Sequence, residues 1–126
     1  MNEKIILIIH DEPLEIQKLK SALAPLEKEG YTIAVENNSD DANLFCEENV
    51  GKIPVAIISR LKHSIVPGSW PNALGGARIA GAKRLLFSNA SFIKGNKPDL
   101  VITGCIPREP FDAEKTLETV KKFLWH

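Results

Sequence analysis

The chain has 126 residues, of which 44% are hydrophobic and 25% are charged. These values are ordinary for a globular protein and exclude a disordered chain or a fibre, and the length predicts one domain over residues 1–126. The longest purely apolar run, Ile5–Ile9, is too short to span a membrane and lacks the flanks of a signal peptide. Because only Cys46 and Cys105 are present, we expect reduced thiols and a cytoplasmic location.

The charges are unevenly distributed, although sixteen basic and sixteen acidic residues give a net charge of zero. Residues 49–98 contain eight basic residues and no acidic one, so all the acidic residues lie in the two ends of the chain. Such a block creates a positive field over part of the surface, which indicates a partner of opposite charge.

Strand and helix signals alternate through the first half of the chain. Ile5–Ile9 is typical of a strand buried on both faces, and Tyr31–Val35 and Val55–Ile58 are β-branched runs of the same kind. The first helix is expected to begin at Pro13 and end at Gly30, with an apolar face made by Ile16, Leu19, Leu23 and Leu26. Ser39 is expected to be the N-cap of the second helix.

The second half continues the alternation. A long loop rich in proline and glycine precedes a weak helix near Asn72–Ala80, and Leu85–Phe87 and Leu100–Cys105 are the next strands. A short helix ending near Gly95 and a last helix capped by Asp112 complete five strand–helix pairs. The pattern predicts an α/β fold: a three-layer, doubly wound (βα)5 parallel sheet, flavodoxin-like, with strand order 2-1-3-4-5.

In such folds the functional site lies at the carboxyl ends of the strands. The first strand is followed there by His10, Asp11 and Glu12. Two carboxylates would repel a phosphate, so a flavin or nucleotide site is disfavoured, and Gly75 and Gly76 are interpreted as packing residues or a helix start. A pair of acids does suit a hard divalent cation such as Mg²⁺.

Three stretches resemble a response-regulator receiver domain. IILIIHDEPLEIQKLKSAL resembles the first strand and helix of that family, and GYTIAVENNSDDANLF resembles its second strand and helix. REPFDAEKTLETVKKFL resembles its Lys-Pro-Phe-Asp turn and last helix. These stretches cover about half of the chain, and the segment between them matches only in the order of its elements.

The resemblance implies a role for each edge position. In the family, acids after the first strand hold Mg²⁺, a third-strand aspartate accepts a phosphoryl group, and a Ser or Thr after the fourth strand senses it. Asp11 and Glu12 match the metal-site acids, Ser88 matches the Ser/Thr position, and Ser59 stands where the aspartate should be, with Arg60 beside it.

The fifth strand departs from the family as well. Glu109, before Pro110, stands where the family has a lysine that pairs with the phosphoryl group, and Ile106 stands at the usual aromatic switch position. A serine hydroxyl cannot form an acyl phosphate, and Glu109 puts negative charge where a cation is needed. Arg60 would instead be able to pair with Asp11 or Glu12 and lock the site; alternatively, these two acids only begin the first helix.

The sequence therefore predicts a degenerate receiver domain, a pseudo-receiver, without catalytic residues or a required cofactor. A weak Mg²⁺ site at Asp11 and Glu12 stays open. The domain would bind another signalling protein, with an acidic surface, and a homodimer is a further expectation. The residues expected to bind that partner are Arg60, Lys62, Trp70, Arg78 and Lys83.

Two alternatives remain open at this point. The positive segment 49–98 would bind an anion or nucleic acid, although no known nucleic-acid motif is present. The chain would otherwise be a weakly active receiver that binds Mg²⁺ and takes a phosphoryl group elsewhere. No assembled set of nucleophile, base and oxyanion donors indicates an enzyme of another kind.

Overall fold

The computed structural model describes residues 4–59, 76–77, 80–88 and 104–124. Its strands are β1 (Ile5–Ile9), β2 (Thr32–Glu36), β3 (Val55–Ser59), β4 (Lys83–Ser88) and β5 (Gly104–Pro107). Its helices are α1 (Pro13–Lys28), α2 (Ser39–Glu48) and α5 (Ala113–Phe123), and Gly76 and Ala77 also have helical conformation.

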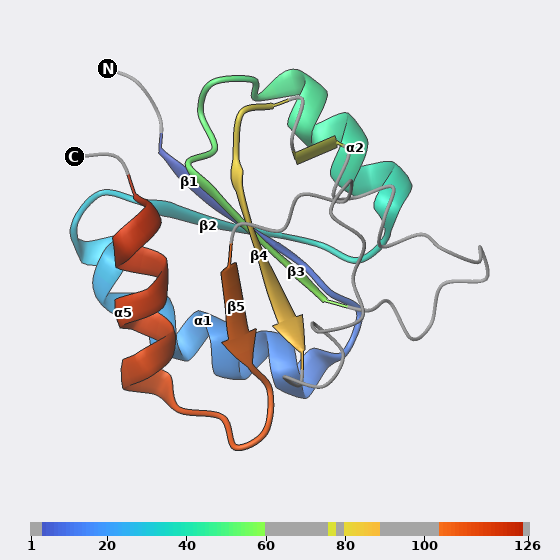
Figure 1. Ribbon diagram of the computed structural model, residues 1–126. Helices are drawn as coiled ribbons and strands as arrows, with labels where there is room; N and C mark the ends of the chain where they lie inside the picture. The colour runs from blue at the N-terminus through green and yellow to red at the C-terminus, as the bar shows by residue number, and fades with distance from the viewer. Residues whose placement is uncertain (1–3, 60–75, 78–79, 89–103, 125–126) are drawn as a thin grey trace.

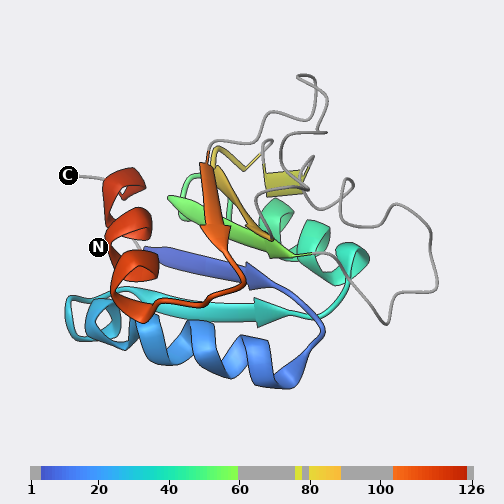
Figure 2. The same ribbon diagram turned by 60° about the horizontal axis from the view of Figure 1, so that its bottom comes forward.

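The five strands form one parallel sheet in the order β2-β1-β3-β4-β5. Helices α1 and α5 lie side by side on one face of the sheet, and α2 covers the other (Figures 1 and 2). The predicted fold class and strand order are confirmed. Because all the strands are parallel, their carboxyl ends meet at one edge of the sheet.

Alternate side chains of the buried strands fill two separate cores. On the α2 face, Leu7, Ile9 and Ile58 pack with Ala42 and Cys46. On the opposite face, a second cluster joins the sheet to α1 and α5; it contains Ile6, Ile8, Ile57, Leu85, Phe87, Ile106, Leu19, Leu23, Leu26, Val120 and Leu124. Strands apolar on both faces are what a sheet between two helical layers requires.

The ends of α1 follow from its local sequence. Pro13 occupies the first turn, where its missing N–H costs nothing, and the Glu12 carboxylate accepts a hydrogen bond from Leu14 N. At the other end Gly30 has a φ of 100°, and Tyr31 N–H donates to Leu26 O. This is the Schellman arrangement that glycine favours, and it confirms Gly30 as the residue that ends the helix.

Several predicted bounds differ from the structure. β2, β3 and β4 each extend by at least one residue at the carboxyl end. β5 is described as Gly104–Pro107, so it ends two residues later than predicted, and its predicted start, residues 100–103, lies outside the described ranges. The N-cap of α2 is Asn38, whose Oδ1 accepts from Asp41 N, whereas Ser39 is buried in the first turn. The short helix expected before Gly95 also lies outside the described residues.

Gly76 packs tightly against α2, in agreement with the prediction that it is a packing residue or a helix start. A Cβ at Gly76 would overlap Oδ1 of Asn43 and lie 2.9 Å from its Cγ. The small residue therefore allows the helical segment at Gly76 and Ala77 to approach α2 closely. Gly75 lies outside the described residues.

Candidate functional site

The carboxyl edge of the sheet brings together the ends of β1, β3, β4 and β5. Ile9 pairs with Ile58 across β1 and β3, so His10 and Ser59 come next to each other at the edge. Ser59 pairs with Phe87 of β4, and Ser88 pairs with Pro107 of β5. The described ends of these strands therefore share one edge of the sheet, as the parallel order predicted.

His10 is fully buried at this edge, and its two ring nitrogens have different partners. The N–H of Asp11 donates to Nδ1 over 3.0 Å, so Nδ1 carries no proton. Nε2 lies 2.7 Å from Oε1 of Glu15 on α1, to which it donates. Such an arrangement fits a neutral imidazole with its proton on Nε2.

Glu15 also reaches the segment that follows β5. Its Oε2 lies 3.3 Å from Nε of Arg108, although this contact lacks the geometry of a hydrogen bond and is an ion pair alone. The exposed fractions of the two side chains are 18% for Glu15 and 25% for Arg108, so water screens the pair only in part. One carboxylate thus joins β1, α1 and the β5–α5 segment.

An aromatic row lies beside this polar group. The ring of Phe87 meets His10 edge-on at 6.0 Å between centroids, and it meets Phe111 in the same way at 6.2 Å. Edge-to-face contacts at this distance are favourable. Phe111 follows Arg108 in the β5–α5 segment, so that segment is held by an ion pair and by ring packing at once.

Ser59 is buried, with 1% of its surface exposed, and its Oγ has no hydrogen-bond partner among the described residues. A buried hydroxyl without a partner costs on the order of 1–3 kcal/mol. The end of β3 therefore presents a neutral, unsatisfied hydroxyl and no anionic group.

No protein-family model and no curated protein matches the sequence. Solved structures do match over nearly the whole chain. The receiver domain of the hybrid histidine kinase CckA aligns with 26% identity, a TM-score of 0.66, and coverage of 96% of this chain and 99% of that one. A Thermotoga maritima response regulator aligns with 18% identity and a TM-score of 0.72 over 96% and 97% of the two chains.

A third match is the Vibrio cholerae chemotaxis protein CheY4, with 16% identity, a TM-score of 0.70 and coverage of 97% and 99%. The chain has the fold of response-regulator receiver domains. In a receiver fold the edge described above is the position of the metal-site acids and the phosphoacceptor, to which the sequence resemblance assigned Asp11, Glu12 and Ser59.

The two acids after β1 are used differently in this receiver fold. The Asp11 side chain is 7% exposed, and its Oδ1 lies 3.9 Å from Nδ1 of His10. Glu12 lies outside this contact, because its Oε1 faces Leu14 N at 3.4 Å as the cap of α1. Helix capping, the alternative reading of the acid pair, therefore describes Glu12 but not Asp11.

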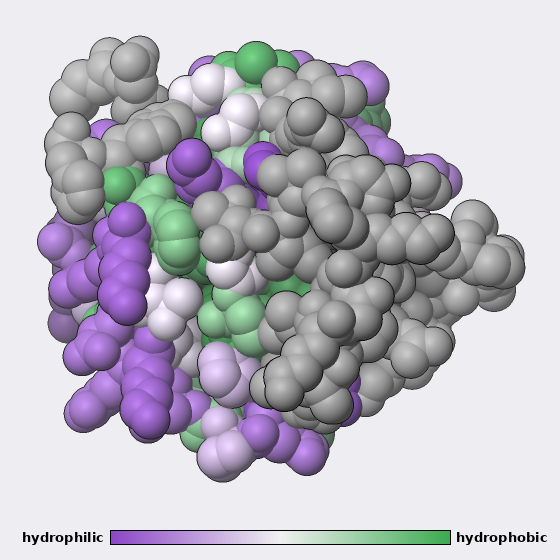
Figure 3. Space-filling view, in the orientation of Figure 1, coloured by the Kyte–Doolittle hydropathy of each residue, from purple (hydrophilic) through white to green (hydrophobic). Residues whose placement is uncertain are grey.

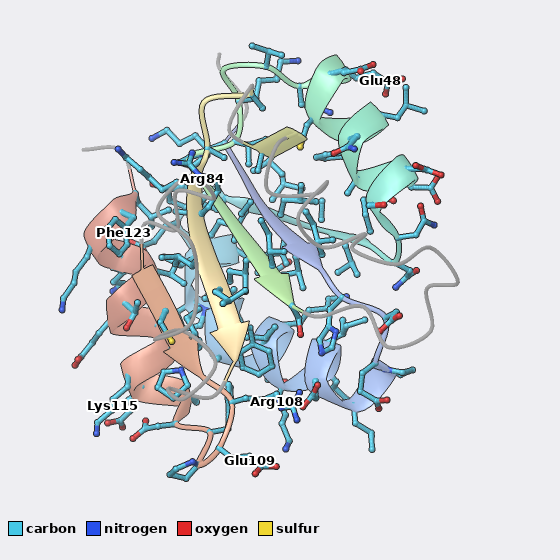
Figure 4. All side chains as sticks on the ribbon, turned by 45° about the vertical axis from the view of Figure 1, so that its right-hand side comes forward. Glu48, Arg84, Arg108, Glu109, Lys115 and Phe123 are labelled. Carbon is cyan, nitrogen blue, oxygen red and sulfur yellow. The ribbon has the colours of Figure 1, made fainter. Side chains whose placement is uncertain are left out.

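Three positions that the resemblance singled out belong to the end of β4, to β5 and to the segment after β5. Ser88 ends β4, Ile106 is fully buried in β5, and a cis peptide bond joins Glu109 to Pro110. Figure 4 shows Arg108 near α1 and the end of β4, and Glu109 at the outer bend of the loop. The exposed Glu109 thus leaves the edge, while its neighbour Arg108 joins it.

The partner-binding set is mostly outside the described residues: Arg60, Lys62, Trp70 and Arg78 are not described. Lys83 is described and exposed, but it begins β4 and lies at the amino edge, opposite the site. The pairing of Arg60 with Asp11 or Glu12 stays a prediction for the same reason.

Only part of the positive segment 49–98 is described. Lys52 is exposed and, like Lys83, lies at the amino edge, where its carbonyl accepts from Ile5 N. Arg84 is half-buried and donates to the carbonyl of Ala82. The binding of an anion or nucleic acid by this segment stays a prediction, because its other five basic residues lie outside the described ranges.

Two observations concern metals and membranes. Within residues 4–59, 76–77, 80–88 and 104–124, no three His, Cys, Asp or Glu side chains are grouped so as to hold a metal ion. In the same ranges, no helix combines the length and the apolar character needed to cross a bilayer.

A groove lies beside the ion pair, between α1 and the start of α5. It has a volume of about 520 Å³ and exposes Leu14, 69% of whose surface is accessible. The outer face of α5 is in contrast hydrophilic (Figure 3), with exposed Lys and Glu side chains. The groove is lined by Leu14, Gln17, Lys18, Ser21, Ala22, Phe111 and Ala113.

Sequence reasoning missed Glu15 and underrated Arg108. Glu15 is an acidic residue in the first turn of α1, where its negative charge interacts favourably with the helix dipole. That interaction alone explains an acid at this position, so the sequence did not indicate a further role. The sequence did contain one signal for this contact, a histidine at the end of a strand followed by a glutamate in the first turn of the next helix. The geometry of the strand–helix connection was needed to bring them together.

Proposed function

We propose that this protein is a receiver-fold domain that works without phosphorylation and binds another signalling protein. The observation that carries the proposal is the buried Ser59 hydroxyl at the end of β3, the position that the sequence resemblance assigns to the phosphoacceptor aspartate. An acyl phosphate requires a carboxylate, and a hydroxyl supplies neither that chemistry nor a negative charge for a metal ion.

The residues around Ser59 support the same reading. His10, the first residue after β1, presents a ring whose Nδ1 is already used by Asp11 N–H. Glu109, which stands at the family's lysine position, is exposed at the outer bend of the loop and supplies no cation to the edge. The described edge therefore offers a phosphoryl group no positive partner except Arg108, which is paired with Glu15.

The described donors also fit Mg²⁺ poorly. This ion demands near-octahedral oxygen ligands, of which carboxylates are the strongest. Asp11 supplies one carboxylate, Glu12 is engaged at the start of α1, and Ser59 offers a neutral oxygen. A domain that lacks a strong metal site has no means of neutralising the charge of a transferred phosphoryl group.

The role in signalling rests on the fold. The structures of similar fold include the receiver domain of a hybrid histidine kinase and a chemotaxis protein. A receiver fold that lacks the phosphoacceptor retains its surface, so binding a signalling protein is the function left to it. The residues that we expect to bind this partner stay those predicted from the sequence: Arg60, Lys62, Trp70, Arg78 and Lys83. We expect the partner to present an acidic surface and the two proteins to meet in the cytoplasm.

The test is incubation with a small phosphodonor, such as acetyl phosphate, and Mg²⁺, followed by intact-mass measurement. We expect the mass of the wild-type protein to stay unchanged. The matched control is the double variant Ser59→Asp with Glu109→Lys, which restores the acceptor and the cation and should gain a hydroxylamine-sensitive phosphoryl group. A phosphoryl adduct on the wild-type chain would contradict the proposal.

A further inference from the structure

The groove between α1 and α5 has walls that come from two separate parts of the chain. Leu14 and Lys18 belong to the α1 wall, and Phe111 and Ala113 belong to the opposite wall. Both walls are described in full, and no backbone hydrogen bond joins residues 108–113 to α1. Side chains alone must therefore set the width of the groove.

The ion pair between Glu15 and Arg108 joins these two walls. Glu15 comes directly after Leu14 on α1, and Arg108 comes shortly before Phe111 on the other wall. Among the described residues, this is the only ion pair between α1 and the β5–α5 segment. Neither residue lines the groove itself, but Glu15 is the neighbour of Leu14 and Arg108 comes three residues before Phe111, and these two do line it.

The buried ring of His10 fixes the orientation of Glu15. Because Nδ1 of His10 accepts the Asp11 N–H, Nε2 is the donor and holds Oε1 of Glu15 at 2.7 Å. Oε2 is then left to face Arg108. A carboxylate held at one oxygen loses less conformational entropy when its other oxygen takes a second partner.

We propose that Glu15 is a positioning residue: an ionic latch that holds the β5–α5 segment against α1 and so keeps the groove at a fixed width. The side chains of His10, Glu15 and Arg108 make these contacts without a phosphoryl group or a metal ion. The latch is therefore permanent, whereas a connection that depended on phosphorylation would be switchable. It goes beyond the proposed function, since the contacts exist whether or not Ser59 or another residue is ever modified.

The latch predicts local, not global, loosening when it is broken. The amides of Lys115 and Thr116, which donate to Oδ1 and O of Asp112, report opening at the start of α5. The amides of Leu7 and Ile8 in β1 report the stability of the whole sheet. The informative quantity is the hydrogen-exchange rate of the α5 amides divided by that of the β1 amides. Local opening at α5 raises this ratio, whereas global destabilisation speeds exchange in β1 at least as much as in α5 and so cannot raise it.

The test uses Glu15→Gln, which keeps an oxygen for His10 but removes the charge that attracts Arg108. We expect the exchange ratio to rise roughly 1.5- to 5-fold, the range for a partly screened ion pair. The matched control, Glu27→Gln, removes a carboxylate from the same helix that has no ion pair among the described residues, and it should leave the ratio unchanged.

A second variant keeps the test decisive if Glu15→Gln does not fold. Arg108→Gln breaks the same contact from the more exposed side and should raise the ratio equally, and the double variant should add nothing to either single change. An unchanged ratio in Arg108→Gln, or strictly additive effects in the double variant, would overturn the latch.

Discussion

The carboxylate of Glu15 lies 2.7 Å from Nε2 of His10 and 3.3 Å from Nε of Arg108. It therefore connects the end of β1 to the segment after the edge strand β5. In a domain with the receiver fold, this is the region where a metal ion and a phosphoryl group would otherwise set the position of the loops. We propose that fixed side-chain contacts take that place here.

Ser59→Ala should not destabilise the protein. The Ser59 hydroxyl is buried without a hydrogen-bond partner, so its removal eliminates an unsatisfied group. We expect the free energy of unfolding from urea titration to stay the same or to rise by about 1 kcal/mol.

The control for this change is Thr116→Val. Thr116 is equally buried, but its Oγ1 donates to the carbonyl of Asp112 over 2.8 Å. Loss of that bond should cost about 1 kcal/mol. A loss in Ser59→Ala as large as that in Thr116→Val would show that the Ser59 hydroxyl has a partner in solution.

Gly76→Ala should be destabilising, and a second change should rescue it. A Cβ at Gly76 overlaps Oδ1 of Asn43, an oxygen that is buried without a hydrogen-bond partner. We expect a cost of about 1–3 kcal/mol for the overpacked variant. Asn43→Ala removes the overlapping atoms, so the double variant should recover most of the loss in thermal or urea unfolding.

This double-mutant cycle separates packing from helix propensity. Alanine is a better helix former than glycine, so propensity alone would make Gly76→Ala stabilising in both backgrounds. A cost that persists unchanged in the Asn43→Ala background would refute the contact between Gly76 and Asn43.

The two thiols should differ in reactivity. Burial, followed by the charge of Glu36, raises the pKa of Cys46 to about 11, and burial also raises the pKa of Cys105. Cys46 is 2% exposed, whereas Cys105 is half-buried. We expect slow alkylation of both by iodoacetamide at neutral pH, with Cys46 the slower in peptide mass spectrometry.

The pKa of Cys46 also predicts a loss of stability in alkali. The unfolded thiol ionises from its ordinary value of 9.0, while the folded thiol keeps its proton until about 11. Since the folded state then binds more protons, the free energy of unfolding should fall as pH rises above 9.0. Cys46→Ala should lessen this slope in urea titrations at several pH values; an identical slope would contradict it.

Glu36 gives a similar prediction in the acid range. Partial burial, and then the negative charge of Asp41, raise the pKa of Glu36 above its ordinary value of 4.5. The folded state holds this proton more tightly, so ionisation of Glu36 lowers stability as pH rises through 4.5 and beyond. Glu36→Gln should remove this fall, and a wild-type slope in that variant would contradict the prediction.

The sheet could be predicted almost completely from the sequence because its signals are local. The apolar run Ile5–Ile9, Gly30 at the end of α1 and Asp112 at the start of α5 each specify their own structure. Asn38 was missed as the α2 N-cap because Asn and Ser are equally good caps and stand next to each other. The bounds of β5 were missed because Ile106 and Pro107 continue the strand into a stretch that resembles a turn.

The candidate site was predicted only in outline. The edge and the position of Ser59 follow from parallel strand order, which sequence reveals. The bridge from His10 through Glu15 to Arg108 depends on side-chain directions at three different elements. Charge patterns in the sequence directed attention instead to Arg60, because it is the nearest cation to Ser59 along the chain.

The most direct test of the central claim is an amide NMR titration of the wild-type protein, first with Mg²⁺ and then with beryllofluoride, which mimics an acyl phosphate. A phosphorylation-independent domain predicts no saturable shifts at Asp11, Ser59 and Ser88 in either step. Saturable shifts at these residues that spread to Arg108 and Glu109 would contradict the account, because they would show that a receiver switch still operates at this edge.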